Sequence, residues 1–207
     1  MTAHRCLFAD GDLRGKKVLV QGGAGAVGLA AILLAKWAGA WVATTVSRAN
    51  QWAIASAAGA DLVINRRDQD VAEVVKSALG GAHIDRIVEV DLMSNAQIDF
   101  ACLSPSGVIS AYATDDPSAE LRLPFLRTMF GGYVIRFVFV YTMPEDAKRQ
   151  AARDISACVA TEKYVPAIAS RFALGDVAAA HQSLENGDAP GKVLVYPAWP
   201  TAAPTNV

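Results

Sequence analysis

One stretch decides the fold of this chain, and it reads Lys17-Val18-Leu19-Val20-Gln21-Gly22-Gly23-Ala24-Gly25-Ala26-Val27-Gly28. It begins as an apolar run of strand character, turns on glycines, and continues into residues 29–36, which have strong helix propensity. Gly23, Gly25 and Gly28 fit the pattern G-x-G-x-x-G. A glycine-rich turn from strand to helix is sometimes only a turn, so the surrounding sequence has to decide its meaning.

Each glycine of the pattern has its own expected task. Gly23 permits a tight turn, Gly25 leaves room for a pyrophosphate beside the backbone, and Gly28 lets the helix pack close to the strand. The start of the helix then offers free N–H groups and a positive dipole end to phosphate groups. We therefore predict that this turn binds a dinucleotide.

The sequence that follows alternates between short apolar runs and helical patterns. Strands are predicted at residues 17–21, 41–46, 62–65, 84–90 and 108–113. Helices are predicted between them at residues 27–38, 52–59, 71–79 and 95–103. Short loops and near-continuous apolar strands indicate parallel strands with helices on both faces. The predicted fold class is α/β, a doubly wound parallel sheet of Rossmann type, with its ligand at the carboxyl ends of the strands.

The second half of the chain is predicted to continue with a short helix at residues 121–130 and a strongly β-prone run, Tyr133–Tyr141. Further elements are predicted at residues 2–8 (helix), 144–161 (helix), 168–172 (strand), 177–185 (helix) and 192–196 (strand). We assign residues 1–197 to one nucleotide-binding domain with a C-terminal helix and strand. Residues 198–207 have no core-forming pattern and are predicted to be a flexible tail.

Composition excludes several classes of function. The chain has 207 residues, 53% of them hydrophobic, which is enough for a sizeable core, and its net charge of -1 gives no electrostatic case for nucleic acid or an anionic membrane. No apolar run reaches transmembrane length, and the N-terminus lacks the long apolar region of a signal peptide. Cys6, Cys102 and Cys158 are odd in number and far apart, unlike a disulfide framework or a zinc cluster. We expect a cytoplasmic protein without a structural metal.

The residues after the second strand bear on the choice of cofactor. An Asp or Glu there would bind the ribose 2′-hydroxyl of NAD, but this chain has Ser47 and Arg48. Arg48 can pair with a 2′-phosphate and Ser47 can donate a hydrogen bond, while Arg66 and Arg67 follow the third strand near the same pocket. Solvated surface arginines are the alternative interpretation. We predict NADP(H) rather than NAD(H).

Three further groups of residues follow the later strands. Asn95 either faces the nicotinamide end or caps a helix, and Glu89, inside an apolar strand, is better explained by a structural hydrogen bond than by a cofactor contact. Tyr112-Ala113-Thr114 closes the fifth strand, where small residues allow backbone contact with a cofactor. Phe137-Val138-Phe139 belongs to the core or an interface, or walls the nicotinamide.

Proton-transfer groups do not emerge from the sequence. None of the five tyrosines has a lysine four residues later, which disfavours a short-chain dehydrogenase, and no Ser-His-Asp pattern, Walker lysine or metal cluster occurs. The catalytic residues therefore remain unassigned.

Four segments in order carry a family resemblance: residues 18–28, Gly59-Ala60-Asp61-Leu62-Val63-Ile64-Asn65, Ile84-Asp85-Arg86-Ile87-Val88-Glu89-Val90 and Gly191-Lys192-Val193-Leu194-Val195. Together they resemble the cofactor half of a medium-chain dehydrogenase/reductase of the zeta-crystallin-like quinone oxidoreductase branch, over about residues 2–197. The resemblance implies reduction of quinones or conjugated carbonyls by NADPH, without zinc. By matching position, it implies cofactor contacts from Ala24, Gly25, Ala26, Val27, Ser47, Arg66, Asn95, Tyr112, Ala113, Thr114, Phe137, Val138 and Phe139. A lysine common in the family after the second strand is missing, and Arg48 is expected to replace it.

Members of that family carry an N-terminal GroES-like substrate domain, which the resemblance implies this chain lacks, as an excised cofactor domain or a truncated gene product. The closing strand at residues 192–196 is then expected to have lost its partners. We also predict a homodimer through Tyr133–Tyr141, because an apolar strand at a sheet edge invites pairing with a second copy. The resemblance implies the same mode of pairing. A buried central strand without an interface is the alternative.

Three functions remain open on the sequence. The leading hypothesis is the cofactor domain of an NADPH-dependent oxidoreductase acting on a small quinone or enone. The alternatives are a stand-alone nucleotide-binding or interaction module without catalysis, and an enoyl reductase unit of a larger synthase. Consumption of NADPH with a quinone, or with a crotonyl thioester, separates them.

Overall fold

The computed structural model describes residues 1–162, 164–187 and 191–197 of the chain. It divides into two compact units, Met1–Val165 and Pro166–Val207. The sequence prediction had placed residues 1–197 in one domain with an appended helix and strand. The predicted tail at residues 198–207 lies outside the described residues.

The first unit is built on a six-stranded sheet in the order β3-β2-β1-β4-β5-β6. Every neighbouring pair of strands is parallel, which confirms the predicted doubly wound α/β class. The strands are β1 (Lys17–Val20), β2 (Trp41–Val46), β3 (Leu62–Asn65), β4 (Ile84–Glu89), β5 (Leu103–Ala111) and β6 (Val134–Phe137).

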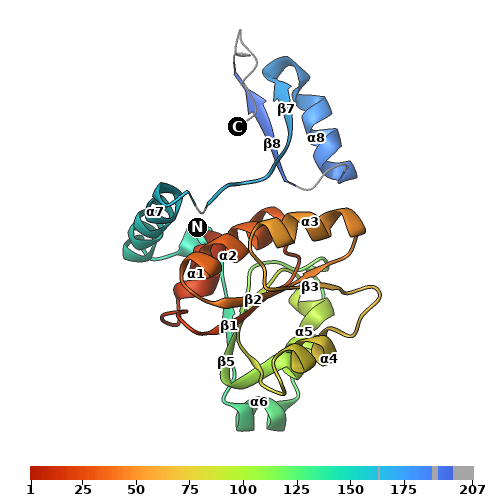
Figure 1. The fold of residues 1–207 in the computed structure, drawn as a ribbon, viewed down its shortest axis with the longest axis vertical. Helices are drawn as coiled ribbons and strands as arrows, with labels where there is room; N and C mark the ends of the chain where they lie inside the picture. The colour runs from red at the N-terminus through yellow and green to blue at the C-terminus, as the bar shows by residue number, and fades with distance from the viewer. Residues whose placement is uncertain (163, 188–190, 198–207) are drawn as a thin grey trace. The chain divides into compact units, whose positions relative to one another are not determined.

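Helices cover both faces of this sheet, as Figure 1 shows. One apolar layer holds buried residues from α1 (Thr2–Phe8), α2 (Ala26–Trp37), α3 (Ala49–Ala57) and α7 (Glu145–Ala160). The opposite layer holds residues from α4 (Val71–Ala78) and α5 (Leu92–Cys102). Val18 and Val20 of β1 enter the first layer and Leu19 enters the second, because successive side chains of a strand point to opposite faces.

The strand at the edge of the sheet is shorter than predicted. The β-prone run was expected to form a strand over residues 133–141, but β6 ends at Phe137 and a 3₁₀ turn, η1, follows at Val140–Thr142. Its partner β5 ends at Ala111, whose carbonyl accepts one last hydrogen bond from the Val138 N–H at 2.8 Å. The run therefore leaves the sheet where its neighbour does.

Two charged side chains connect the edge strand and the centre of the sheet to α1 and the loop that follows it. Arg136 of β6 makes two hydrogen bonds to the carboxylate of Asp10, at 2.8 and 2.5 Å. Arg86 of β4 is buried and donates to the main-chain carbonyls of Leu7 and Asp10. The hydrogen bonds from Arg136 hold the pKa of Asp10 below its usual value.

Two other boundaries differ from the prediction. α5 begins at Leu92 rather than Asn95, and β5 begins at Leu103 although a break was predicted at residues 104–107. The break is present as an irregularity in the β4–β5 pairing, where the register shifts between Ile84 and Arg86. The helix α6 (Phe125–Gly131) then leads into β6.

The second unit contains a 3₁₀ turn, η2 (Leu174–Asp176), and the helix α8 (Val177–Asn186) between two parallel strands. These strands are β7 (Ile168–Ala173) and β8 (Lys192–Tyr196). The expectation that the closing strand lacks partners is wrong, because β8 pairs with β7.

All three cysteines are buried, and none of them forms a disulfide. Cys6 and Cys158 lie in the layer of α1 and α7, and Cys102 lies in the layer of α4 and α5. Burial raises the pKa of both Cys6 and Cys102 to about 12. Within the described part of the chain, no helix combines the length and apolar character needed to cross a membrane.

Candidate functional site

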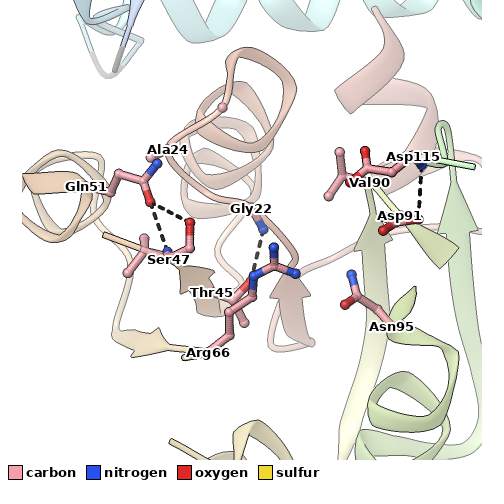
Figure 2. A pocket seen from close by; sticks show the side chains of 12 residues that line it. Gly22, Ala24, Thr45, Ser47, Gln51, Arg66, Val90, Asp91, Asn95 and Asp115 are labelled. Atoms are coloured by element: carbon pink, nitrogen blue, oxygen red, sulfur yellow. Dashed lines mark hydrogen bonds between the residues drawn. The ribbon is translucent and has the colours of Figure 1, made fainter. Parts of the chain in front are cut away.

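A cleft of about 260 Å³ lies at the carboxyl ends of the parallel strands. It opens between β1 and β4, where the strand order of the sheet reverses, which is the usual ligand position in this architecture. Figure 2 shows side chains that reach it from the ends of β2, β3 and β4. The lining residues are Gly22, Ala24, Gly25, Thr45, Val46, Ser47, Gln51, Arg66, Val90, Asp91, Asn95 and Asp115.

The glycine turn after β1 differs from the prediction in the task of Gly23. The backbone with positive φ is at Gly22 (φ 70°), so this residue rather than Gly23 makes the tight turn possible. A Cβ on Gly23 would lie 2.0 Å from Thr44 Oγ1, and a Cβ on Gly28 would lie 2.3 Å from the Gly22 carbonyl oxygen. Gly23 and Gly28 are therefore packing residues that hold α2 against β1 and β2.

Gly25 is the member of the pattern that faces the cleft. It is exposed, it is the N-cap of α2, and a Cβ there would meet nothing nearer than the Gly22 carbonyl oxygen at 3.3 Å. The first N–H groups of the twelve-residue α2 have no partner within the helix and carry the positive end of its dipole. An open backbone beside a helix N-terminus fits a pyrophosphate group.

The end of the cleft beside β2 and β3 presents donors and a cation. Gln51 Oε1 accepts hydrogen bonds from the Ser47 and Arg48 N–H groups at 2.9 and 3.1 Å, which fixes the start of α3. Figure 2 shows Arg66 extending into the cleft toward Gly22. The residues that line the cleft from this end are Thr45, Val46, Ser47, Gln51 and Arg66, and none of them is acidic. Arg48 is exposed at the N-cap of α3 and does not line the cleft.

The opposite wall is polar and ordered by hydrogen bonds around Asp91. Its Oδ1 accepts from the Thr114 hydroxyl and from the Asp115 N–H, both at 3.2 Å (Figure 2 shows the second). Burial raises the pKa of Asp91, but hydrogen bonds from Ser94, Asp115 and Thr114 outweigh burial and lower this pKa below its usual value. Asp91 therefore stays ionised at neutral pH.

Asn95 belongs to the same wall. Its side-chain amide donates to Glu89 Oε1 at 3.0 Å, and α5 begins with Asp91 as its N-cap, so the helix-cap alternative for Asn95 is wrong. Glu89 is fully buried and has the hydrogen bonds that a structural role requires, including one from the Asp91 N–H.

A second cavity of about 270 Å³ lies beside the ends of β5 and β6. It brings together both triplets singled out in the sequence and is lined by Leu92, Met93, Ala111, Tyr112, Ala113, Thr114, Phe137, Val138 and Phe139. Thr114 connects the walls of the two cavities, because it lines the second cavity and its hydroxyl donates a hydrogen bond to Asp91, which lines the first. Burial raises the pKa of Tyr112, so this phenol stays protonated near neutral pH.

Most of the predicted site residues line one of the two cavities. Residues predicted for the site but lining neither cavity are Gly23, Ala26, Val27, Gly28 and Arg48. Residues that line the first cavity but were not predicted for the site include Gly22, Thr45, Gln51, Asp91 and Asp115. Gln51 left a signal in the sequence, since a polar residue at the start of a predicted helix often reaches back to the preceding N–H groups. Among the described residues, no group of three or more His, Cys, Asp or Glu is placed to hold a metal ion.

A glycine turn at the switch point of a doubly wound parallel sheet defines a dinucleotide-binding α/β domain. Residues 26–157 match the family described as zinc-binding dehydrogenase, and the chain belongs to that family.

Known proteins of this kind match nearly the whole chain. It is 29% identical to a quinone oxidoreductase of Pongo abelii over 94% of its own length and 59% of that protein. It is 26% identical to a 2-haloacrylate reductase of a Burkholderia species, over 95% of this chain and 60% of the relative. The structure of mycobacterial Rv1454c complexed with NADPH has a TM-score of 0.80 and 25% identity, over 95% of this chain and 62% of the other. The resemblance to quinone oxidoreductases is thus confirmed, and the chain spans about three-fifths of the length of these relatives.

Proposed function

We propose that this chain binds NADP(H) as the cofactor-binding part of an oxidoreductase that reduces a quinone or a conjugated carbonyl, without zinc. The relatives named quinone oxidoreductase and 2-haloacrylate reductase support this class of substrate. The neighbouring structure complexed with NADPH supports the class of cofactor.

The observation that carries the proposal is the charge distribution along the first cavity. The glycine turn and the start of α2 suit a pyrophosphate, and the end beside β2 and β3 offers Ser47 and Arg66 with no carboxylate. A carboxylate there would bind the 2′-hydroxyl of NAD and repel a 2′-phosphate. Arginine instead makes strong charge-assisted hydrogen bonds to phosphate.

The second cavity suits the nicotinamide end. Ala113 offers backbone contacts, Thr114 a hydroxyl held by Asp91, and Phe137 an apolar wall. Bound NADPH would supply a hydride to an electrophilic carbon of the substrate, and a proton from solvent would complete the two-electron reduction. The protonated phenol of Tyr112 belongs to the wall of this cavity.

Two measurements test the proposal together. Calorimetric titration should show that NADPH binds more tightly than NADH, and absorbance at the nicotinamide band should show consumption of NADPH with 1,4-benzoquinone above the rate without protein. Binding without any turnover of quinone or crotonyl thioester would favour a nucleotide-binding module without catalysis. Preference for the thioester would favour an enoyl reductase, and no binding of either cofactor would contradict the proposal.

A further inference from the structure

Two carboxylic acids lie buried beneath the cleft. Glu89 at the end of β4 and Asp99 in α5 are both 0% exposed. Glu89 Oε1 accepts hydrogen bonds from the Asn95 amide and the Asp91 N–H, and Asp99 Oδ1 accepts one from Gln21 Nε2 at 2.9 Å. Their other oxygens, Glu89 Oε2 and Asp99 Oδ2, are buried and receive no hydrogen bond from an N–H or hydroxyl donor among the described residues. The two carboxyl groups interact with each other, so one proton between them would satisfy both orphaned oxygens.

Hydrogen bonds extend from this pair to both sides of the cleft. On one side, Gln21 Oε1 accepts from the Thr45 hydroxyl at 2.8 Å, and Thr45 Oγ1 accepts from the Gly22 N–H at 3.0 Å. On the other side, Glu89 holds Asn95. Two series of hydrogen bonds therefore reach the pair, one from the glycine turn after β1 to Asp99 and one from the wall formed by α5 to Glu89, and their outer ends line the cleft (Figure 2 shows the bond from Gly22 to Thr45).

The surroundings of the pair disfavour two negative charges. Burial raises the pKa of Glu89 and of Asp99, and the neighbouring charge raises that of Asp99 further. The other titratable groups that interact with the pair are Asp91, Cys102 and Tyr112, all of them acids, so none supplies a positive charge. Two adjacent buried carboxyl groups without a cation retain a proton that they would lose in water.

We propose that Glu89 and Asp99 share one proton and that this shared proton holds both walls of the cofactor cleft in position. Its effect reaches the Gly22 N–H through Gln21 and Thr45, and it reaches the opposite wall through Asn95. Loss of the proton would place two carboxylates in contact between β4 and α5 and disturb both walls. Nucleotide affinity would then fall at alkaline pH. Gln21 and Asp99 are positioning residues in this scheme, and its ligand rests on the proposed function.

Asp99→Asn removes the shared, titratable proton but keeps the shape and the hydrogen bonds of the side chain. The amide would donate permanently to Glu89 Oε2, while its oxygen would still accept from Gln21. Gln21→Leu instead keeps both acids and removes the link to Thr45. Ser110→Ala is the matched control, because Ser110 is equally buried in β5 and its hydroxyl is not part of this series of bonds.

The experiment measures NADPH affinity by calorimetry from about pH 6 to about pH 10, because the pKa of the pair is raised above that of an ordinary carboxyl group. Above that pKa, the parent and Ser110→Ala should lose up to about tenfold in affinity per pH unit, and Asp99→Asn should show no such alkaline loss. Gln21→Leu should bind weakly at every pH, and its Gly22 amide should exchange with deuterium faster than in the parent. An alkaline loss that is the same in Asp99→Asn and the parent would overturn the proposal, as would unchanged Gly22 exchange in Gln21→Leu.

A second measurement, the free energy of unfolding without ligand, tests the shared proton independently of the proposed function. The folded pair binds a proton that the unfolded acids release near pH 4, so the free energy of unfolding should fall as pH rises from there through the raised pKa. Asp99→Asn should remove that part of the slope, and an unchanged slope would contradict the shared proton. Failure of the parent to bind NADPH at any pH would instead contradict the proposed function and leave the unfolding and exchange results to decide on the proton.

Discussion

Gly25 and Gly28 are three residues apart, yet a larger side chain is expected to affect cofactor binding at Gly25 and the stability of the fold at Gly28. A side chain on Gly25 enters the cleft, whereas a side chain on Gly28 runs into the backbone of Gly22. We predict that Gly25→Val keeps its circular dichroism spectrum and loses the thermal stabilisation by NADPH. Gly28→Val should lose about 1–3 kcal/mol of stability or more, because the neighbouring backbone cannot move aside cheaply.

Thermal shifts with and without NADPH distinguish the two variants. If Gly25→Val kept the full ligand-induced shift, the phosphate group would have to lie elsewhere. If Gly28→Val were as stable as the parent, the close approach of α2 to β1 would not be a constraint on the fold.

Arg66 and Arg67 are neighbouring exposed arginines, but Arg66 lines the cleft and Arg67 does not. We predict that Arg66→Ala weakens NADPH binding by about 1.5–3 kcal/mol, roughly ten- to hundredfold in Kd, because it removes a charge-assisted hydrogen bond to the 2′-phosphate. NADH, which lacks that phosphate, should bind with nearly the same Kd as before. Arg67→Ala is the matched control, and calorimetry of both cofactors is the measurement. An equal loss for NADPH and NADH would show that Arg66 does not recognise the 2′-phosphate.

For single residues, the sequence predicted what depends on local pattern. The glycine spacing located the turn, and an acid inside an apolar strand predicted that Glu89 would be hydrogen-bonded, as it is. The positive φ of Gly22 was missed because Gly23 fits the motif and Gly22 does not. The partnership of Glu89 with Asp99 depends on how α5 packs against β4, which no local pattern encodes.

The edge strand β6 and the helix α6 expose an unusual amount of apolar surface. Phe125 and Phe130 of α6, Phe137 of β6 and the neighbouring Tyr141 are each at least 70% exposed. The edge position of β6 agrees with the interface predicted at Tyr133–Tyr141, although the strand itself is shorter. An exposed apolar edge invites pairing with a second copy about a two-fold axis.

We predict that the chain is a homodimer through this edge and that Val134→Lys shifts it toward monomer. A lysine on an edge strand opposes pairing, because its charge would have to be buried or placed against its symmetry mate. Light scattering should give about twice 21.8 kDa for the parent and a lower mass for the variant. Val159→Lys, at an exposed valine of α7, should leave the mass unchanged. A parent that stays monomeric at high micromolar concentration would rule the interface out.

The elements themselves were predictable to different degrees. β2, β3 and β8 have the predicted bounds, because each is a short apolar run enclosed by residues that break regular structure. β6 was predicted too long because residues 138–141 have high β propensity but lose their neighbour when β5 ends. Strand length at a sheet edge is decided by the partner, which propensity does not report.

The second cavity has an aromatic wall that is exposed in the first unit. Phe137 and Phe139 are 70% and 62% exposed, so no described residue of the first unit covers the place proposed for the nicotinamide. Positioning of two reactants can be worth about 7–11 kcal/mol of a reaction barrier. We predict that this chain alone reduces 1,4-benzoquinone far more slowly than the roughly 10 s⁻¹ of ordinary enzymes. Steady-state oxidation of NADPH is the assay, and a rate near that value would show that the cleft is sufficient by itself.

Labelling of the three buried cysteines by a thiol reagent would report where the folded chain opens locally. A thiol reagent needs both access and thiolate, and Cys6 and Cys102 have little of either while the fold is closed. Cys6 and Cys158 sample one helical layer and Cys102 samples the other. The order in which the three sulfurs are labelled therefore records which layer leaves the sheet first, with no tag or added chromophore.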